Sequence, residues 1–125
     1  MSTTSSLIQG IDTIIIRVSH AANAKKWYTE TLGFNVLFED ESMGLVVLDT
    51  GGPTSLTLWK TDQPIKGDSK TSAYPIFKTK DAEALRNELE KKDVKVDAIE
   101  QDEYVKFFHF YDPDGNMLEA CQLLQ

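Results

Sequence analysis

The first apolar pattern in the chain is that of a β-strand. Residues 11–18 are rich in β-branched side chains, and their alternation gives the strand two different faces. The purely apolar face carries Ile14, Ile16 and Val18, and the other face carries Thr13, Ile15 and Arg17. The apolar face requires a covering element, and residues 21–32 have the period of an amphipathic helix, with Ser19 as the expected N-cap and Gly33 at its end.

Shorter apolar runs follow this helix and are separated by turn residues. They predict strands at 34–39, 44–49 and 55–60. The next stretch, residues 61–71, is polar and contains Pro64 and Gly67, so we expect it to be a linker.

After the linker the pattern starts again. A strand at 73–79 precedes a helix at 81–92, whose inward side chains are expected to be Ala82, Leu85, Leu89 and Ala84. Three more strands are predicted at 94–100, 104–111 and 117–123. The chain therefore has the pattern of an α+β fold made of tandem βαβββ modules, which suggests an internal duplication. The expected organisation is a flexible tail at 1–9, a first module at 10–60, the linker, and a second module at 72–125.

The closing segment reads as a strand, a tight turn and a second strand. The turn is Asp112-Pro113-Asp114-Gly115-Asn116, in which Pro113 fixes φ and Gly115 accepts a positive φ. Beyond the turn, Glu119 is the single charge in the otherwise apolar segment 117–121. A carboxylate in this position should face a cavity, a partner or an ion, or else mark a strand with one wet face.

Composition and charge narrow the classes of partner. Of 125 residues, 41% are hydrophobic and 26% are charged, which argues against disorder. No apolar run approaches the ~20 residues of a membrane span. The net charge of −7 repels phosphate backbones and anionic headgroups, so nucleic acid and membrane partners are not expected. Cys121 is the only cysteine, which favours a reducing, cytoplasmic location and a role as a small buried hydrophobe.

Two motifs at the right separation carry a family resemblance. They are Trp27-Tyr28 followed by Leu32-Gly33-Phe34, and the Asp112–Asn116 turn that ends three residues before Glu119. In both, the chain resembles the vicinal oxygen chelate (VOC) superfamily, which includes glyoxalase I, extradiol dioxygenases, fosfomycin-resistance enzymes and bleomycin-resistance proteins. The resemblance extends from Gly10 to the C-terminus. It implies one VOC domain, in which each module curls its strands into half of an open barrel and the ligand occupies the enclosed cleft.

Enzymes of this superfamily hold a divalent metal on side chains of the first, fourth, fifth and eighth strands. The matching positions here are Thr13, Thr57, Pro75 and Glu119, so Glu119 alone retains a family ligand. One carboxylate cannot supply the three or four protein ligands that a divalent cation needs. We therefore expect no metal and no other cofactor, with a divalent metal on Glu119 and His109 as the open alternative.

Other side chains are expected to line the cleft. His109 lies ten residues before Glu119, at a position where the family often has a tyrosine that points toward the substrate. Arg17 matches an arginine that contacts a substrate carboxylate in glyoxalase I. It is expected either to bind an anionic ligand or to form an ion pair with Glu119 or another acid. Trp59 and Phe77 are expected either to form aromatic walls or to pack in the core.

These residues support different functions. The leading hypothesis is a metal-independent protein that binds a small molecule in the cleft, as bleomycin-resistance proteins do. The alternative is a lyase, isomerase or dioxygenase-like enzyme, with or without a divalent metal, whose candidate catalytic residues are Glu119 and His109. A structural dimer module without a ligand is a third possibility, and the family resemblance implies a homodimer in each case. The candidate ligand-binding residues are Thr13, Arg17, Thr57, Trp59, Phe77, His109 and Glu119.

Overall fold

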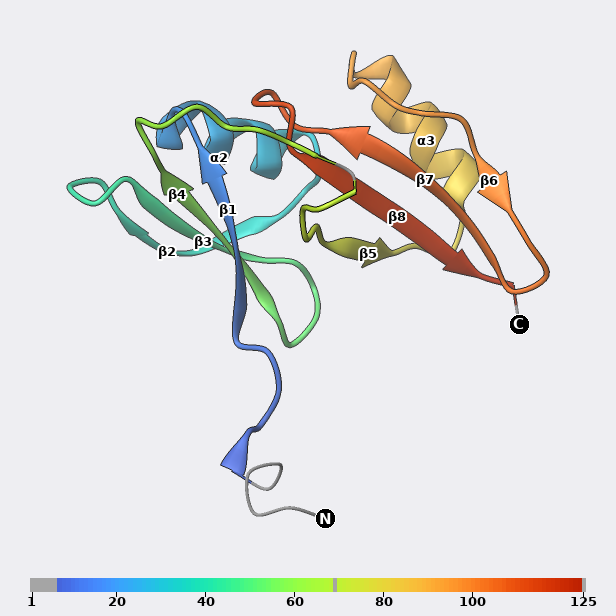
Figure 1. The fold of residues 1–125 in the computed structure, drawn as a ribbon, viewed down its shortest axis with the longest axis horizontal. Coiled ribbons are helices and arrows are strands. Elements are labelled where there is room, and N and C mark those ends of the chain that lie inside the picture. The colour runs from blue at the N-terminus through green and yellow to red at the C-terminus, as the bar shows by residue number, and fades with distance from the viewer. Residues whose placement is uncertain (1–6, 69, 125) are drawn as a thin grey trace.

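Two βαβββ units follow one another along the chain (Figure 1) in a computed structural model that describes residues 7–68 and 70–124. The first unit consists of β1 (Thr13–Val18), α2 (Ala21–Glu30), β2 (Asn35–Asp40), β3 (Leu45–Asp49) and β4 (Ser55–Lys60). The second consists of β5 (Ile76–Lys78), α3 (Ala82–Lys91), β6 (Glu100–Gln101), β7 (Val105–Tyr111) and β8 (Met117–Leu123). The α+β fold and the tandem order are confirmed. Of the flexible tail predicted for residues 1–9, residues 1–6 lie outside the described residues.

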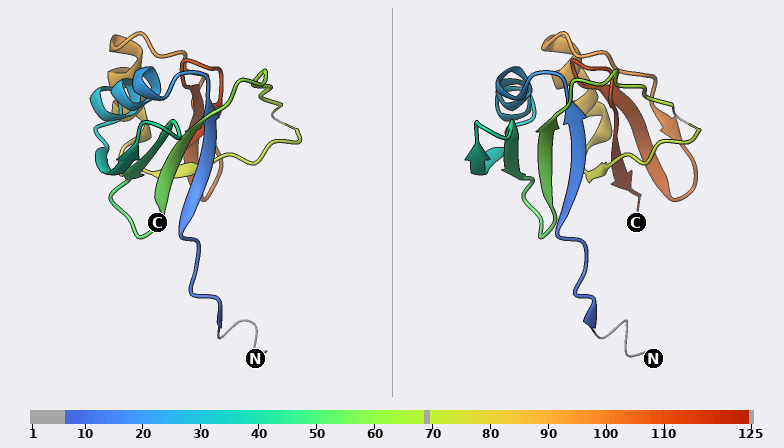
Figure 2. Two further views of the ribbon diagram at one scale, coloured as in Figure 1. Left: turned by 90° about the vertical axis from the view of Figure 1, so that its left-hand side faces the viewer. Right: turned by 60° about the vertical axis from the view of Figure 1, so that its left-hand side comes forward.

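The strands form two open, mixed sheets with the same internal order. The first sheet runs β1-β4-β3-β2 and the second runs β5-β8-β7-β6. In each sheet the first strand pairs in parallel with the last, and the remaining neighbours are antiparallel. The repeated order supports an internal duplication. The predicted mixed sheet is therefore divided into two four-stranded halves, which lie side by side in Figures 1 and 2.

Each helix covers one face of a sheet and encloses a core. On β1 the predicted division of faces is confirmed, because Ile16 and Val18 are buried while Ile15 is 50% exposed. On α2, Ala24 and Tyr28 are buried, and Trp27 and Leu32 pack against the core, as the period of an amphipathic helix requires. In the second unit, the buried residues include Ala82 and Leu89 of α3 and the strand residues Phe108, Phe110, Leu118 and Ala120.

Two local predictions for the helices were wrong. The N-cap of α2 is His20, not Ser19, and the His20 side chain makes no capping bond. Ser19 does not cap the helix, because its amide and hydroxyl groups both donate to the Asp114 carboxylate, at 3.0 and 2.5 Å. On α3, Ala84 is exposed instead of turned inward. The Ala84 amide donates the capping hydrogen bond to the Asp81 carboxylate, 3.0 Å away.

The second sheet has shorter edge strands than the pattern predicted. The strand expected at 73–79 is reduced to β5, because Pro75 has no amide hydrogen to donate and precedes the first paired residue. The strand expected at 94–100 pairs regularly only in β6, with an isolated bridge from Val96 to Phe110. Between Val96 and β6, the Asp97 carbonyl accepts a hydrogen bond from the Arg86 side chain of α3 at 2.7 Å. This carbonyl is therefore not used for pairing within the sheet.

The connection from β4 to β5 crosses from the first sheet to the second (Figure 1) and includes the predicted linker. No helix among the described residues is long and apolar enough to cross a membrane.

Candidate functional site

On the open face of the first sheet, two threonine hydroxyls meet. The Oγ1 atoms of Thr13 and Thr57 lie 2.7 Å apart, and Thr57 is buried. The contact follows from the parallel pairing of β1 with β4, which places these side chains on the face opposite the core. One hydroxyl donates to the other, so the two side chains form a hydrogen-bonded pair.

Further along the same face, Arg17 packs over Trp59. The Arg17 guanidinium carbon lies 5.0 Å from the centre of the Trp59 ring. Nε donates to the Trp59 carbonyl at 3.0 Å and Nη2 donates to the Lys60 carbonyl at 2.9 Å. The structure does not contain the ion pair between Arg17 and Glu119 that was one expectation. Within the described residues Arg17 pairs with no acid, and the end of β4 takes its Nε and Nη2 donors.

On the open face of the second sheet, His109 and Glu119 are direct cross-strand neighbours. His109 Nε2 lies 3.0 Å from Glu119 Oε1, and Glu119 is only 7% exposed. The ring nitrogen does not point along a hydrogen-bonding direction, so Nε2 is buried without a hydrogen-bond partner among the described atoms. The two atoms are within hydrogen-bonding distance, although the ring orientation in the structure forms no hydrogen bond between them.

Aromatic rings surround this pair. Tyr74 and Phe107 meet the His109 ring edge to face, with centroids 5.7 and 5.8 Å away. Cys121 is the next residue of β8 on this face. The sequence suggested that it is buried, but the structure shows that it is only partly buried. Burial raises the pKa of the Cys121 thiol, and the nearby Glu119 and Asp102 carboxylates raise it further. The thiol is therefore a poor nucleophile at neutral pH.

Phe77 lies on the other face of the second sheet. The parallel register sets Ile76 opposite Glu119 and Phe77 opposite the buried Ala120. The Phe77 ring packs against Phe34 at 5.4 Å and against Phe110 at 6.4 Å. The structure thus supports the packing alternative for Phe77, on the opposite side of the sheet from Glu119.

The four positions that match the metal ligands of the superfamily do not form a donor set. Thr13 and Thr57 bond to each other, and the Pro75 side chain has no donor atom. No three His, Cys, Asp or Glu side chains converge within residues 7–68 and 70–124. No hydrogen bond or ion pair among those residues joins the threonine pair to His109 and Glu119. These residues do not fit a divalent metal.

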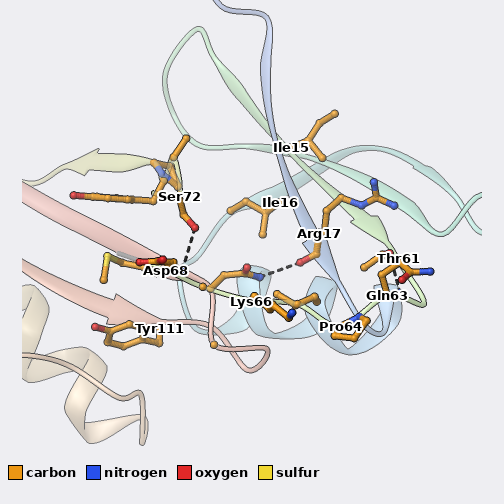
Figure 3. Close-up of a pocket in the computed structure, with 18 residues that line it drawn as sticks. Ile15, Ile16, Arg17, Thr61, Gln63, Pro64, Lys66, Asp68, Ser72 and Tyr111 are labelled. Atoms are coloured by element: carbon orange, nitrogen blue, oxygen red, sulfur yellow. Dashed lines mark hydrogen bonds between the residues drawn. The ribbon is translucent and has the colours of Figure 1, made fainter. Parts of the chain in front are cut away.

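A cavity of about 500 Å³ lies where the two modules meet the linker (Figure 3). One wall comes from β1, a second from the linker, and a third from β7 and β8 and the turn between them. Its apolar lining includes Ile15, Ile65, Tyr74, Pro75, Tyr111 and Met117. Arg17 and Lys66 contribute the positive charges, and Asp68 contributes the negative one. Of the seven candidate residues, only Arg17 lines this cavity, and Figure 3 shows its side chain running toward β4.

The closing turn ties the two modules together beside this cavity. Asp112 is buried and accepts from the Tyr28 hydroxyl of α2 at 2.8 Å. It also accepts from the amide and side chain of Asn116, whose Nδ2 donates in addition to the Arg17 carbonyl at 3.0 Å. Burial raises the pKa of Asp112, although its hydrogen bonds oppose that rise. Sequence reasoning assigned these residues to a local turn, and the position of Tyr28 beside Asp112 came only from the fold.

Comparison with known proteins settles the family. The model of the Glyoxalase/Bleomycin resistance protein/Dioxygenase superfamily matches residues 10–120. The chain belongs to this superfamily. Among curated protein sequences there is no match.

Solved structures of superfamily proteins share the fold over nearly the whole chain. A member of the superfamily from Sphaerobacter thermophilus has a TM-score of 0.79 at 23% identity, covering 93% of this chain and 98% of that one. TnmS3, an antibiotic binding protein from Streptomyces sp. CB03234, has a TM-score of 0.74 at 26% identity, covering 93% and 97%. Lactoylglutathione lyase from Agrobacterium tumefaciens has a TM-score of 0.74 at 15% identity, covering 92% and 94%. The superfamily fold thus occurs in a binding protein and in an enzyme.

Proposed function

We propose that this superfamily member binds a small organic molecule, without a metal, in the cavity at the junction of its modules. The observation that carries the proposal is the cavity itself, whose volume of about 500 Å³ lies in the range of small-molecule sites. Its lining combines apolar and aromatic side chains with a few charged ones, as such sites do. The similarity to TnmS3, an antibiotic binding protein, is consistent with a binding role.

The charges of the cavity favour a ligand with a carboxylate. Arg17 uses Nε and Nη2 for main-chain carbonyls, so its Nη1 group has no partner among the described residues. Lys66 is exposed at the same cavity and forms no ion pair with any residue that the structure describes. A carboxylate held by these two cations, with an apolar body against Tyr74 and Met117, would use the features of this lining.

A thermal-shift screen of aromatic and aliphatic carboxylates against EDTA-treated protein tests this proposal. A binding compound should raise the unfolding temperature of the wild type, and the Arg17→Ala variant should lose most of that shift. Lys80→Ala is the matched control, since Lys80 is exposed and lies outside the cavity. Stabilisation that needs an added metal ion, or that is equal in all three proteins, would contradict the proposal.

The alternative is an enzyme that uses Glu119 and His109, with or without a divalent metal. Their separation of 3.0 Å and the burial of Glu119 favour this candidate, because a shielded acid and imidazole can move a proton together. Titration with manganese, nickel, zinc and ferrous ions, followed by elemental analysis, distinguishes the metal-dependent form of this enzyme from the metal-independent binding role. One tightly bound ion per chain that is lost in Glu119→Ala would favour the enzyme and contradict the simple binding role.

We also propose that the protein forms a homodimer. The open sheet faces leave large apolar side chains uncovered, among them Ile15 of β1 and Ile76 of β5, which are 50% and 56% exposed. A second copy packed on these faces would remove them from water. A dimer that binds none of the screened compounds would instead favour a structural module without a ligand, and a monomeric mass in sedimentation would contradict dimerisation.

A further inference from the structure

The described residues that precede β1 form an apolar arm. Residues 7–11, here called the arm, carry no charged side chain, and Leu7, Ile8 and Ile11 are 77%, 64% and 66% exposed. Figures 1 and 2 show the chain leaving the lower end of β1 and running away from both sheets. Three large aliphatic side chains in so short a stretch are unfavourable in water, so the arm should have a surface to cover it.

A second cavity offers such a surface. This intermodular groove, with a volume of about 810 Å³, lies on the core side of the sheets, between the loop that joins β3 to β4 and the elements β5 and α3. Its floor is apolar and includes Leu32, Phe34, Phe77, Leu85, Leu89 and Phe110. Among the described residues, Lys78 and Glu88 are the only charged ones that line it. The groove therefore suits aliphatic side chains and offers little to a strongly charged ligand.

The arm begins at the rim of this groove. Thr54 lines the groove, and its hydroxyl donates to the Ile11 carbonyl at 2.9 Å. The preceding residue, Gly10, has φ of +122°, a backbone conformation that favours glycine and turns the chain at this point. Before Gly10 the described part of the arm runs away from the two sheets, so residues 7–9 do not cover the groove of their own chain, and Leu7 and Ile8 are exposed.

We propose that the arm of one copy docks in the intermodular groove of a second copy, and that the exchange is reciprocal. Each chain carries one apolar arm and one apolar groove, so a twofold-symmetric dimer would bury both arms in the two grooves. The uncharged arm matches the nearly uncharged groove lining. The contact between arm and groove does not involve the cavity at the junction of the modules. The small-molecule proposal therefore stands even if the arm does not dock in the groove.

Sedimentation equilibrium of the full chain provides the first test. Ile8→Asp should weaken dimerisation at least tenfold, because it would place a charge in the groove. Gln9→Asp is the matched control: it adds the same charge at the next, exposed position and should change dimerisation less than twofold. Equal effects of the two variants, or a wild type that is monomeric at all concentrations, would overturn the proposal.

A groove variant supplies the complementary test. A Cβ atom added at Gly52 would meet no atom within 4 Å, and Gly52 lines the groove, so Gly52→Trp can fill part of it without a backbone clash. It should weaken dimerisation as much as Ile8→Asp does. If Gly52→Trp dimerises like the wild type while Ile8→Asp does not, the arm binds elsewhere and the proposal is wrong.

Disulfide trapping distinguishes the second copy from other occupants. In a Cys121→Ser background, an Ile8→Cys chain mixed with a Thr50→Cys chain should give a mixed disulfide dimer, whereas Met43→Cys, at an exposed turn, should not replace Thr50→Cys. A double variant that forms the link within one chain would place the arm in its own groove and overturn the exchange. A groove that binds a naphthalene dye equally in wild type and Ile8→Asp would be a small-molecule pocket, which also contradicts the proposal.

Discussion

At the scale of single residues, alternation along a strand predicts which face a side chain takes but not what it meets. Thr13 and Arg17 lie on the open face of β1 as predicted, yet Arg17 binds Trp59 and two carbonyls of β4 instead of an acid. Phe77 lies on the core face because the register of β5 is fixed only after Pro75, and the sequence does not mark where that short strand begins. The contact of His109 with Glu119 required the register of β7 with β8.

The hydroxyl of Tyr28 makes a buried hydrogen bond between the two modules. Tyr28→Phe should lower the free energy of unfolding by about 1–3 kcal/mol, because the buried Asp112 carboxylate loses a hydrogen bond. Urea unfolding measures the change. Tyr104→Phe is the control, since Tyr104 is 63% exposed and should change stability by less than about 0.5 kcal/mol. Equal losses in both variants would show that the buried bond contributes nothing of its own.

The raised pKa of Asp112 predicts a pH dependence of stability. An aspartate in the unfolded chain titrates near a pKa of about 3.9. Because burial raises the pKa of Asp112 in the folded protein, the folded state keeps this proton at pH values where the unfolded chain has lost it. The contribution is therefore fully present below about pH 4 and is lost as the pH rises through the raised pKa. Urea unfolding between pH 4 and 7 should show a smaller decline in Asp112→Asn than in wild type; parallel curves would contradict this.

At the scale of elements, periodicity predicted both helices and the central strands, because each of these buries a regular apolar face. Periodicity did not predict the edge strands of the second sheet correctly, because single contacts determine where these strands pair. Residues 94–99 have a strand pattern but pair irregularly, since Arg86 takes the Asp97 carbonyl. The apolar arm and the intermodular groove were also missed, because the groove exists only once the two modules are placed.

The two helix starts differ in a way that stability measurements can detect. Asp81 caps α3 through its side chain, whereas the His20 side chain caps nothing on α2. Asp81→Ala should therefore lower the free energy of unfolding by about 1 kcal/mol, and His20→Ala should change it little. Thermal or urea unfolding of the two variants checks this, and a larger loss in His20→Ala would contradict the capping assignment.

At the scale of the whole molecule, the tandem fold and the superfamily were predictable because the chain carries two family motifs and a pattern that repeats over most of its length. The site was only partly predictable. The candidates divide between two open sheet faces, Phe77 lies in the core, and the junction cavity includes linker residues that sequence reasoning left out, such as Ile65 and Lys66. A linker has no periodicity, so its contribution to a cavity appears only in three dimensions.

The central claim is that a small carboxylate binds in the junction cavity without a metal. It is tested most directly by two-dimensional NMR of the EDTA-treated protein during titration with a compound identified in the screen. We predict saturable shift changes at Ile15, Lys66 and Met117, which line the cavity, and none at Leu37 on β2, which lies outside it. Changes centred on His109 and Glu119 that occur only after a divalent metal is added would contradict the account.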